Sequence, residues 1–159
     1  MKDVVDQLAS EKSEHVEKLI EWLKIPSVST DSSLKGEVRR AGQWIEEELS
    51  SAGFETRLDD TDGHPICLAQ WTGAEGAPTL LIYGHYDVQP PEPLDLWRHG
   101  AFEPTLEGDD LVARGATDDV QCWALRCLVV VATRCDRFAC RSGAPRHADG
   151  NSNRIEAHQ

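Results

Sequence analysis

Two short motifs in the sequence carry side chains of the types that can bind metal ions. His85 and Asp87 follow an apolar segment, and Asp118 and Asp119 follow a second short segment further along the chain. In an extended segment, residues i and i+2 project to the same side, so His85 can offer one ring nitrogen to a metal while Asp87 braces the other. A carboxylate can also bridge two divalent ions with a water between them, which suits a hydrolase. Together the motifs indicate half of a metal site.

Each motif taken alone also has an ordinary structural interpretation. A histidine close to an aspartate in a loop is more often capped or salt-bridged than bound to a metal. Two aspartates before an apolar segment are equally consistent with a helix N-terminus, where carboxylates offset the helix macrodipole. The residue types and their spacing therefore leave both interpretations open for each motif.

The other histidines and the cysteines are weaker candidates. His15 falls on the charged face of a helix and is predicted to be solvated, His64 beside Pro65 is typical of a turn, and His99 lies in a proline-rich loop. Four cysteines between residues 122 and 140 raise the alternative of a structural zinc site. Their spacing matches no common zinc finger, so this alternative is less favoured.

Composition narrows the classes of function. The chain has 159 residues, enough for one domain, and its formal net charge of −12 argues against nucleic acid as a partner, because phosphates repel an acidic surface. The longest apolar stretch, at residues 125–132, is far shorter than the roughly 18 residues that span a bilayer. The first residues do not resemble a signal peptide. We therefore expect a cytoplasmic protein with reduced thiols and no membrane partner.

The hydrophobic pattern predicts helices followed by strands. Apolar residues recur every three or four positions over 3–24 and 36–51, which predicts two amphipathic helices that end before Pro26 and Gly53. We expect short strands at 54–58 and 66–71, a fully buried central strand at 78–83, an irregular segment at 88–104 and a tight hairpin at 106–112. This order predicts an α/β domain in which helices cover a sheet.

Several segments resemble the landmarks of a known family, in the same order and at familiar spacing. They are Ile25 to Ser29, Tyr83 to Pro90, Trp97, Phe102 to Pro104, and Arg114 to Asp119. Their joint occurrence over residues 4–119 makes the sequence similar to the zinc-dependent aminoacylase, carboxypeptidase and dipeptidase superfamily of metallopeptidases. Within it, the sequence most resembles the carnosinase-like dipeptidases.

The resemblance implies the N-terminal, incomplete part of an α/β catalytic domain that carries two zinc ions. By the family pattern His85 binds one zinc ion, Asp118 bridges both, and Asp87 acts in catalysis by orienting His85. A metal-bound water, deprotonated with the help of a glutamate, attacks the peptide bond of a small peptide substrate such as a dipeptide. A site of histidine and carboxylate ligands can also hold manganese or cobalt. Full-length relatives are expected to be homodimers.

The sequence departs from the family pattern after Asp119. Family members continue with Lys-Gly-Gln, whereas Val120 and Gln121 follow here, and nothing matches the family's Glu-Glu pair or its late histidine. Residues 122–159 hold 3 acidic and 6 basic side chains, against 25 and 10 in residues 1–121. We therefore divide the chain into residues 1–119, the start of a metallopeptidase catalytic domain, and residues 120–159, an aberrant tail that is frameshifted or disordered.

A truncated chain of this kind is expected to be inactive by itself. A complete structural zinc site is worth on the order of 10 to 16 kcal/mol, and halving its ligands should forfeit most of that free energy. An alternative from a different class is a catalytically dead interaction module that keeps the start of the fold and binds a partner through its basic tail. A structural zinc protein built on the tail cysteines is a third interpretation.

Overall fold

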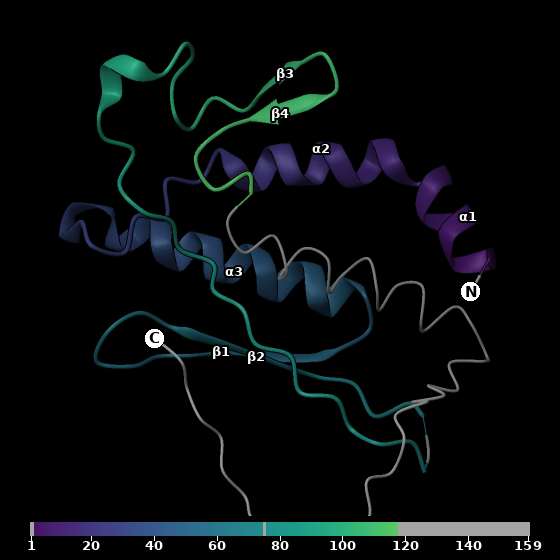
Figure 1. The fold of residues 1–159 in the computed structure, drawn as a ribbon. Helices are drawn as coiled ribbons and strands as arrows, with labels where there is room; N and C mark the ends of the chain where they lie inside the picture. The colour runs from purple at the N-terminus through teal and green to yellow at the C-terminus, as the bar shows by residue number, and fades with distance from the viewer. Residues whose placement is uncertain (1, 75, 118–159) are drawn as a thin grey trace, which may run out of the picture.

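The computed structural model describes residues 2–74 and 76–117 (Figure 1). Asp118, Asp119 and the predicted tail at 120–159, with its cysteines, lie outside the described residues. The described elements are, in chain order, α1 (Lys2–Ser10), α2 (Lys12–Leu23), the 3-10 helix η1 (Ser32–Leu34), α3 (Lys35–Ser51), β1 (Glu55–Asp59), β2 (Ile66–Gln70), the 3-10 helix η2 (Leu94–Leu96), β3 (Thr105–Glu107) and β4 (Asp110–Val112). No described helix is long and apolar enough to cross a membrane.

Helices α1 and α2 stand where the sequence pattern predicts one helix over 3–24. The backbone of Glu11, with φ −97° and ψ 5°, departs from helical geometry and separates them. Hydrogen bonds nevertheless continue across the break, from Glu11 N to Gln7 O at 3.0 Å and from His15 N to Glu11 O at 3.1 Å. The result is a bend rather than a loop, visible in Figure 1. Helix α2 ends at Leu23, as the following Pro26 predicts.

Helix α3 supplies the centre of the hydrophobic core. Its predicted apolar stripe is buried, since Val38 and Ala41 are 0% exposed and Ile45 is 6% exposed. The segment after α2 packs into the same core, where Leu23, Ile25 and Val28 are also buried. Each such aliphatic side chain contributes roughly 1.5 to 3 kcal/mol when it is removed from water. This core fixes the chain that enters the candidate site.

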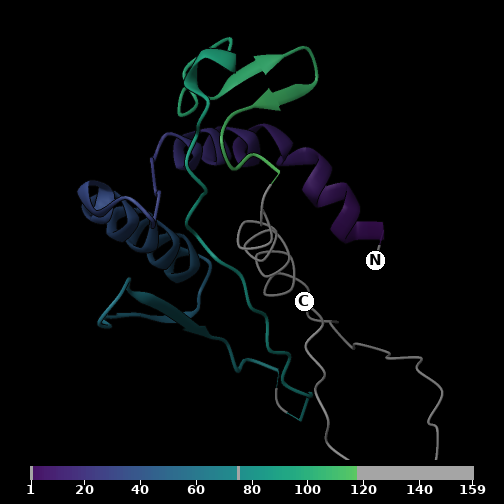
Figure 2. The ribbon, with the colours of Figure 1, turned by 60° about the vertical axis from the view of Figure 1, so that its left-hand side comes forward.

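Strands β1 and β2 form an antiparallel hairpin against α3. The register pairs Glu55 with Gln70 and Asp59 with Ile66. Gly53, with φ +94°, adopts the left-handed conformation and lets the chain reverse after α3, where the sequence predicts that the helix ends. Figures 1 and 2 show α3 lying over one face of this hairpin, so the strands predicted at 54–58 and 66–71 and the mixed helix and sheet layers are confirmed.

The prediction of a fully buried central strand at 78–83 is wrong for the described structure. Leu81 is 91% exposed and Tyr83 is 82% exposed, and no described strand includes these residues. An apolar sequence becomes a strand only when a neighbour accepts its backbone hydrogen bonds. Neither described sheet, β1–β2 or β3–β4, includes residues 78–83. The run is instead an extended chain that leads to the site.

The chain from 88 to 117 forms a separate excursion beside α2. Residues 88–104 contain little regular structure beyond η2, as predicted from the prolines. Strands β3 and β4 then form the predicted hairpin, with Gly108 at φ +65° in its turn. Arg114 N donates to Ala101 O at 2.8 Å and returns the chain toward α2. Figure 1 shows this green excursion above α2.

Candidate metal site

Two segments that are far apart in the sequence lie side by side and form the base of the site. An isolated parallel bridge joins Val28 to Val88. Val88 N donates to Ser27 O at 3.0 Å, and the Ser27 hydroxyl donates to Tyr86 O at 2.9 Å. Ser27 and Val28 are each only 2% exposed. Because α2 ends just before this segment, its serines are free of helix hydrogen bonding and can bind residues 86–88.

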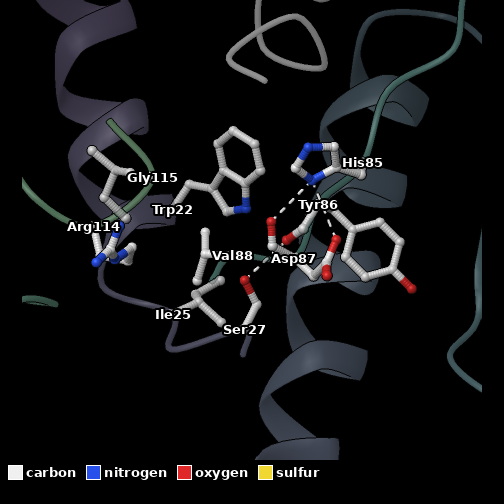
Figure 3. A pocket seen from close by; sticks show the side chains of 10 residues that line it. Trp22, Ile25, Ser27, His85, Tyr86, Asp87, Val88, Arg114 and Gly115 are labelled. Carbon is white, nitrogen blue, oxygen red and sulfur yellow. Dashed lines mark hydrogen bonds and ion pairs between the residues drawn. The ribbon is translucent and has the colours of Figure 1, made fainter. Parts of the chain in front are cut away.

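His85 and Asp87 make the contact that the sequence predicts. His85 Nδ1 lies 3.2 Å from Asp87 Oδ1 and 3.0 Å from the Asp87 backbone oxygen. A carbonyl and an ionised carboxylate only accept hydrogen bonds, so Nδ1 carries the imidazole proton. In the neutral imidazole the ring lone pair is then on Nε2, which is the arrangement of a histidine that binds metal through Nε2. Figure 3 shows the imidazole turned toward the Asp87 carboxylate.

The second oxygen of Asp87 also has a partner. The Ser29 hydroxyl donates to Asp87 Oδ2 at 2.5 Å. His64 Nε2 lies 3.0 Å from the Ser29 backbone oxygen and therefore donates to it. His64 is the turn residue that the sequence predicts, between β1 and β2, and it steadies the segment that carries Ser29.

Tyr86 anchors the site segment to the other side of the fold. Its hydroxyl donates to the Pro65 backbone oxygen. Its ring packs against Gly42 of α3, where an added Cβ would lie 3.3 Å from Tyr86 Cζ. Burial raises the pKa of the Tyr86 hydroxyl, and the negative charge of Asp87 raises it further. Tyr86 therefore stays neutral near pH 7 and acts as a structural donor.

The second sequence motif approaches the first at Gly115. This glycine has φ +83°, and a Cβ there would lie 2.7 Å from Val88 Cγ1, so only glycine fits this close approach. Arg114 lies over the Trp97 ring at 5.3 Å, a cation–π contact that holds the preceding loop. Arg114 and Gly115 line a small pocket that Trp22, His85 and Asp87 also line (Figure 3).

Among the described residues, no group of three or more His, Cys, Asp and Glu side chains is arranged to hold a metal. The described part of the site therefore supplies His85 with its Asp87 brace. This pair fits the donor chemistry of a divalent metal ion, because imidazole is the commonest metal ligand and a carboxylate is its usual partner. The predicted ligand Asp118 lies outside the described residues, so its role stays a prediction.

Sequence reasoning missed the residues that support His85 and Asp87. Ser27 and Ser29 alternate with the buried Val28, and this period of two could have indicated that both serines face a neighbouring segment. His15 was predicted to be solvated, but its side chain is 12% exposed and lies 3.6 Å from Glu11 Oε2. The bend between α1 and α2 at Glu11 accompanies this burial.

The chain was compared with known proteins. Cys-Gly metallodipeptidase dug1 of Schizosaccharomyces pombe is 32% identical over 128 residues, which cover 74% of this chain and 26% of that protein. Human carnosine dipeptidase 1 has a crystal structure that matches with a TM-score of 0.76 and 26% identity, covering 85% of this chain and 32% of that one. The M20 family metallo-carboxypeptidase Sso-CP2 of Sulfolobus solfataricus matches with a TM-score of 0.61 and 34% identity, over 73% of this chain and 27% of that one.

The chain is therefore a homologue of the M20 family metallopeptidases. The family resemblance and the α/β fold class inferred from sequence are both confirmed. The chain spans about a quarter of the length of the curated relative, 26% of it. No protein-family model matches the chain.

Proposed function

We propose that residues 1–119 form the N-terminal part of the catalytic domain of a metal-dependent hydrolase of dipeptidase type. The observation that carries this proposal is the contact between His85 Nδ1 and Asp87 Oδ1 at 3.2 Å, because a carboxylate is the usual support of a metal-binding histidine. The homologues include metallodipeptidases, which supports a peptide substrate. We extend the proposal to a cytoplasmic, homodimeric parent enzyme on the basis of the family resemblance.

In this proposal zinc is the metal, and His85 binds one of two ions. Asp87 holds the imidazole, and Asp118 bridges the ions. Support for Asp118 comes from its position three residues after Gly115, which approaches Val88 in the described structure. Zinc supplies Lewis-acid polarisation of the peptide carbonyl and activation of a water. Manganese and cobalt suit the same ligands.

We also propose that the 159-residue polypeptide, taken alone, does not turn over dipeptides. The described residues supply a single braced histidine toward a site that needs several ligands and a general base. The change of charge after residue 121 and the departure from Lys-Gly-Gln support the division into residues 1–119 and an aberrant, frameshifted or disordered tail at 120–159. Sequencing the coding DNA tests the frameshift, since another reading frame after codon 119 should encode Lys-Gly-Gln and a Glu-Glu pair.

The experiment is a calorimetric zinc titration of the 159-residue chain, with His85→Ala and His99→Ala as variants. His99 is a matched control because it lies in the excursion, 3.6 Å from Glu107, outside the candidate site. We expect weak zinc binding that His85→Ala reduces and His99→Ala leaves unchanged. A dipeptide hydrolysis assay with added zinc should give no turnover.

Three outcomes would contradict the proposal in different ways. Two tight zinc sites, or dipeptide turnover by the 159 residues, would overturn the proposed inactivity. Zinc binding that survives His85→Ala but is lost when the tail cysteines are alkylated would favour the structural zinc alternative. No zinc binding together with stoichiometric capture of a protein partner by the tail would favour the interaction module.

A further inference from the structure

We propose that Ser29 is a positioning residue of the candidate metal site: its hydroxyl orients the Asp87 carboxylate so that the imidazole proton of His85 stays on Nδ1. The relevance of this role to metal binding rests on the proposed function, in which His85 is a ligand. The structural relationship itself concerns only described residues and can be tested without metal.

The two oxygens of Asp87 divide their partners between Ser29 and His85. Oδ2 accepts from the Ser29 hydroxyl at 2.5 Å, and Oδ1 lies 3.2 Å from His85 Nδ1. The terminal torsion of an aspartate is broad and costs little to rotate. A hydrogen bond on Oδ2 therefore fixes where Oδ1 points, and so fixes the acceptor that His85 meets.

Solvent exposure makes this anchor necessary. The side chains of His85 and Asp87 are 40% and 36% exposed, so water competes for every hydrogen bond between them. A neutral imidazole in water carries its proton mainly on Nε2, which would place a hydrogen where a metal must bind. Acceptors held rigidly at Nδ1 reverse this preference.

Ser29 is itself held from two sides. The preceding residue, Val28, is 2% exposed and pairs with Val88. His64 donates to the Ser29 backbone oxygen at 3.0 Å, from the turn between β1 and β2. The hydroxyl therefore projects from a backbone that the core and the hairpin both fix.

The Ser29 hydroxyl is not required to join the two segments. Ser27 already links them by its hydroxyl bond to Tyr86 O and by accepting from Val88 N. These bonds involve the backbone of residues 86–88, whereas Ser29 binds the Asp87 side chain. Ser27 therefore holds the two segments together, whereas Ser29 orients the Asp87 carboxylate.

The test is nitrogen-15 NMR of the imidazoles in the metal-free 159-residue chain, recorded at an alkaline pH at which the His85 ring signals no longer change with pH. The His85 signals are assigned by their loss in His85→Ala. We expect His85 to carry its proton on Nδ1, and Ser29→Ala to shift the tautomer ratio toward Nε2 by about fivefold, the effect of one lost hydrogen bond. Ser29→Thr, which keeps the hydroxyl, should restore the ratio.

Ser33→Ala is the matched control. Its hydroxyl also donates to a carboxylate, Asp31 Oδ1 at 2.7 Å, but away from the site. This variant should leave the His85 ratio unchanged. Dispersed amide spectra check folding, and if Ser29→Ala does not fold, Ser29→Cys replaces it, because a thiol is a weak donor of similar size.

A folded Ser29→Ala chain with an unchanged His85 tautomer ratio would overturn the proposal. A second readout is the zinc dissociation constant, which Ser29→Ala should raise by about tenfold, as loss of a support to a metal ligand does. If His85→Ala has no effect on zinc binding, the proposed function fails, while the tautomer measurement still decides the role of Ser29.

Discussion

Ser27 and Tyr86 are 59 positions apart in the chain, yet the Ser27 hydroxyl donates to the Tyr86 backbone oxygen at 2.9 Å. Ser27 is buried, with 2% of its surface exposed. The buried Ser27 hydroxyl therefore needs a partner inside the protein, and the Tyr86 carbonyl supplies it. It ties the end of α2 to the segment that carries His85 and Asp87.

The first prediction concerns this bond. Ser27→Ala should lower the free energy of unfolding by about 1 kcal/mol, because it removes a part-buried hydrogen bond between two segments. Urea denaturation followed by circular dichroism measures the change. Ser10→Ala is the control, since that hydroxyl donates to Gln7 O at 2.7 Å on an exposed surface. Equal losses in the two variants would show that burial does not strengthen the Ser27 bond.

The second prediction concerns two glycines in α3. An added Cβ at Gly42 would lie 3.1 Å from Leu58 Cδ1 and 3.3 Å from Tyr86 Cζ, whereas at Gly36 it would meet nothing within 4 Å. Alanine in a helix gains roughly 1 kcal/mol over glycine. Gly36→Ala should therefore stabilise the chain, measured by thermal unfolding.

Gly42→Ala should not give the stabilisation that Gly36→Ala gives. The Tyr86 ring cannot easily retreat, because its hydroxyl is bonded to Pro65 O. We expect Gly42→Ala to be less stable than Gly36→Ala by about 1 kcal/mol or more, the usual cost of overpacking. Equal stabilisation by both alanines would mean that the packing of Tyr86 on α3 is loose.

The third prediction concerns the ion pair between α2 and α3. Lys18 Nζ lies 3.2 and 3.0 Å from the two carboxylate oxygens of Glu48, and the side chains are 25% and 19% exposed. A double-mutant cycle with Lys18→Met and Glu48→Gln should give a coupling of about 1 kcal/mol. The cycle is needed because both side chains have further contacts.

The matched pair is Arg57 and Asp59, at 2.8 Å but with 68% and 47% of the side chains exposed. Its coupling should be below about 0.5 kcal/mol and should vanish at high salt, because exposed charges are screened. A larger coupling for the exposed pair than for Lys18 with Glu48 would contradict the argument from burial.

Local pattern predicted the elements whose partners are near in sequence. Helix α3, the β1–β2 hairpin and the β3–β4 hairpin are close to their predicted ranges because periodicity and turn glycines act within a few residues. The run at 78–83 was assigned wrongly because its state depends on neighbouring strands, which a sequence window does not contain. Its exposed Leu81 illustrates that apolar composition alone does not bury a segment.

The candidate site likewise has one contact that the local sequence predicts and one that it does not. The contact of His85 with Asp87 follows from a spacing of two residues, so the sequence predicted it. The hydroxyl of Ser29 reaches Asp87 across 58 positions, and nothing local to either residue indicates the pair. Metal binding by His85 and Asp118 remains a prediction, because it depends on the metal and on residues outside the described structure.

The last prediction concerns Cys67 on β2. Burial raises the pKa of its thiol to about 11, and the negative charge of Glu46 contributes to the same shift. Only the thiolate reacts with alkylating agents. At pH 8.5, iodoacetamide should therefore modify Cys67 at least about tenfold more slowly in the native chain than in urea, where the pKa is near 8.5. Peptide mapping by mass spectrometry isolates Cys67 from the other cysteines.

The same shift predicts how stability depends on pH. Between about pH 8.5 and the native pKa, the unfolded chain releases the Cys67 proton while the native chain keeps it, so the free energy of unfolding falls as pH rises through this window. Cys67→Ala should remove this part of the decline. The measurement is the difference in urea midpoint between the unchanged chain and Cys67→Ala at each pH from 8 to 10. Parallel curves for the two chains, or equal alkylation rates in native and unfolded protein, would show that the thiol is more accessible to water than its position on β2 indicates.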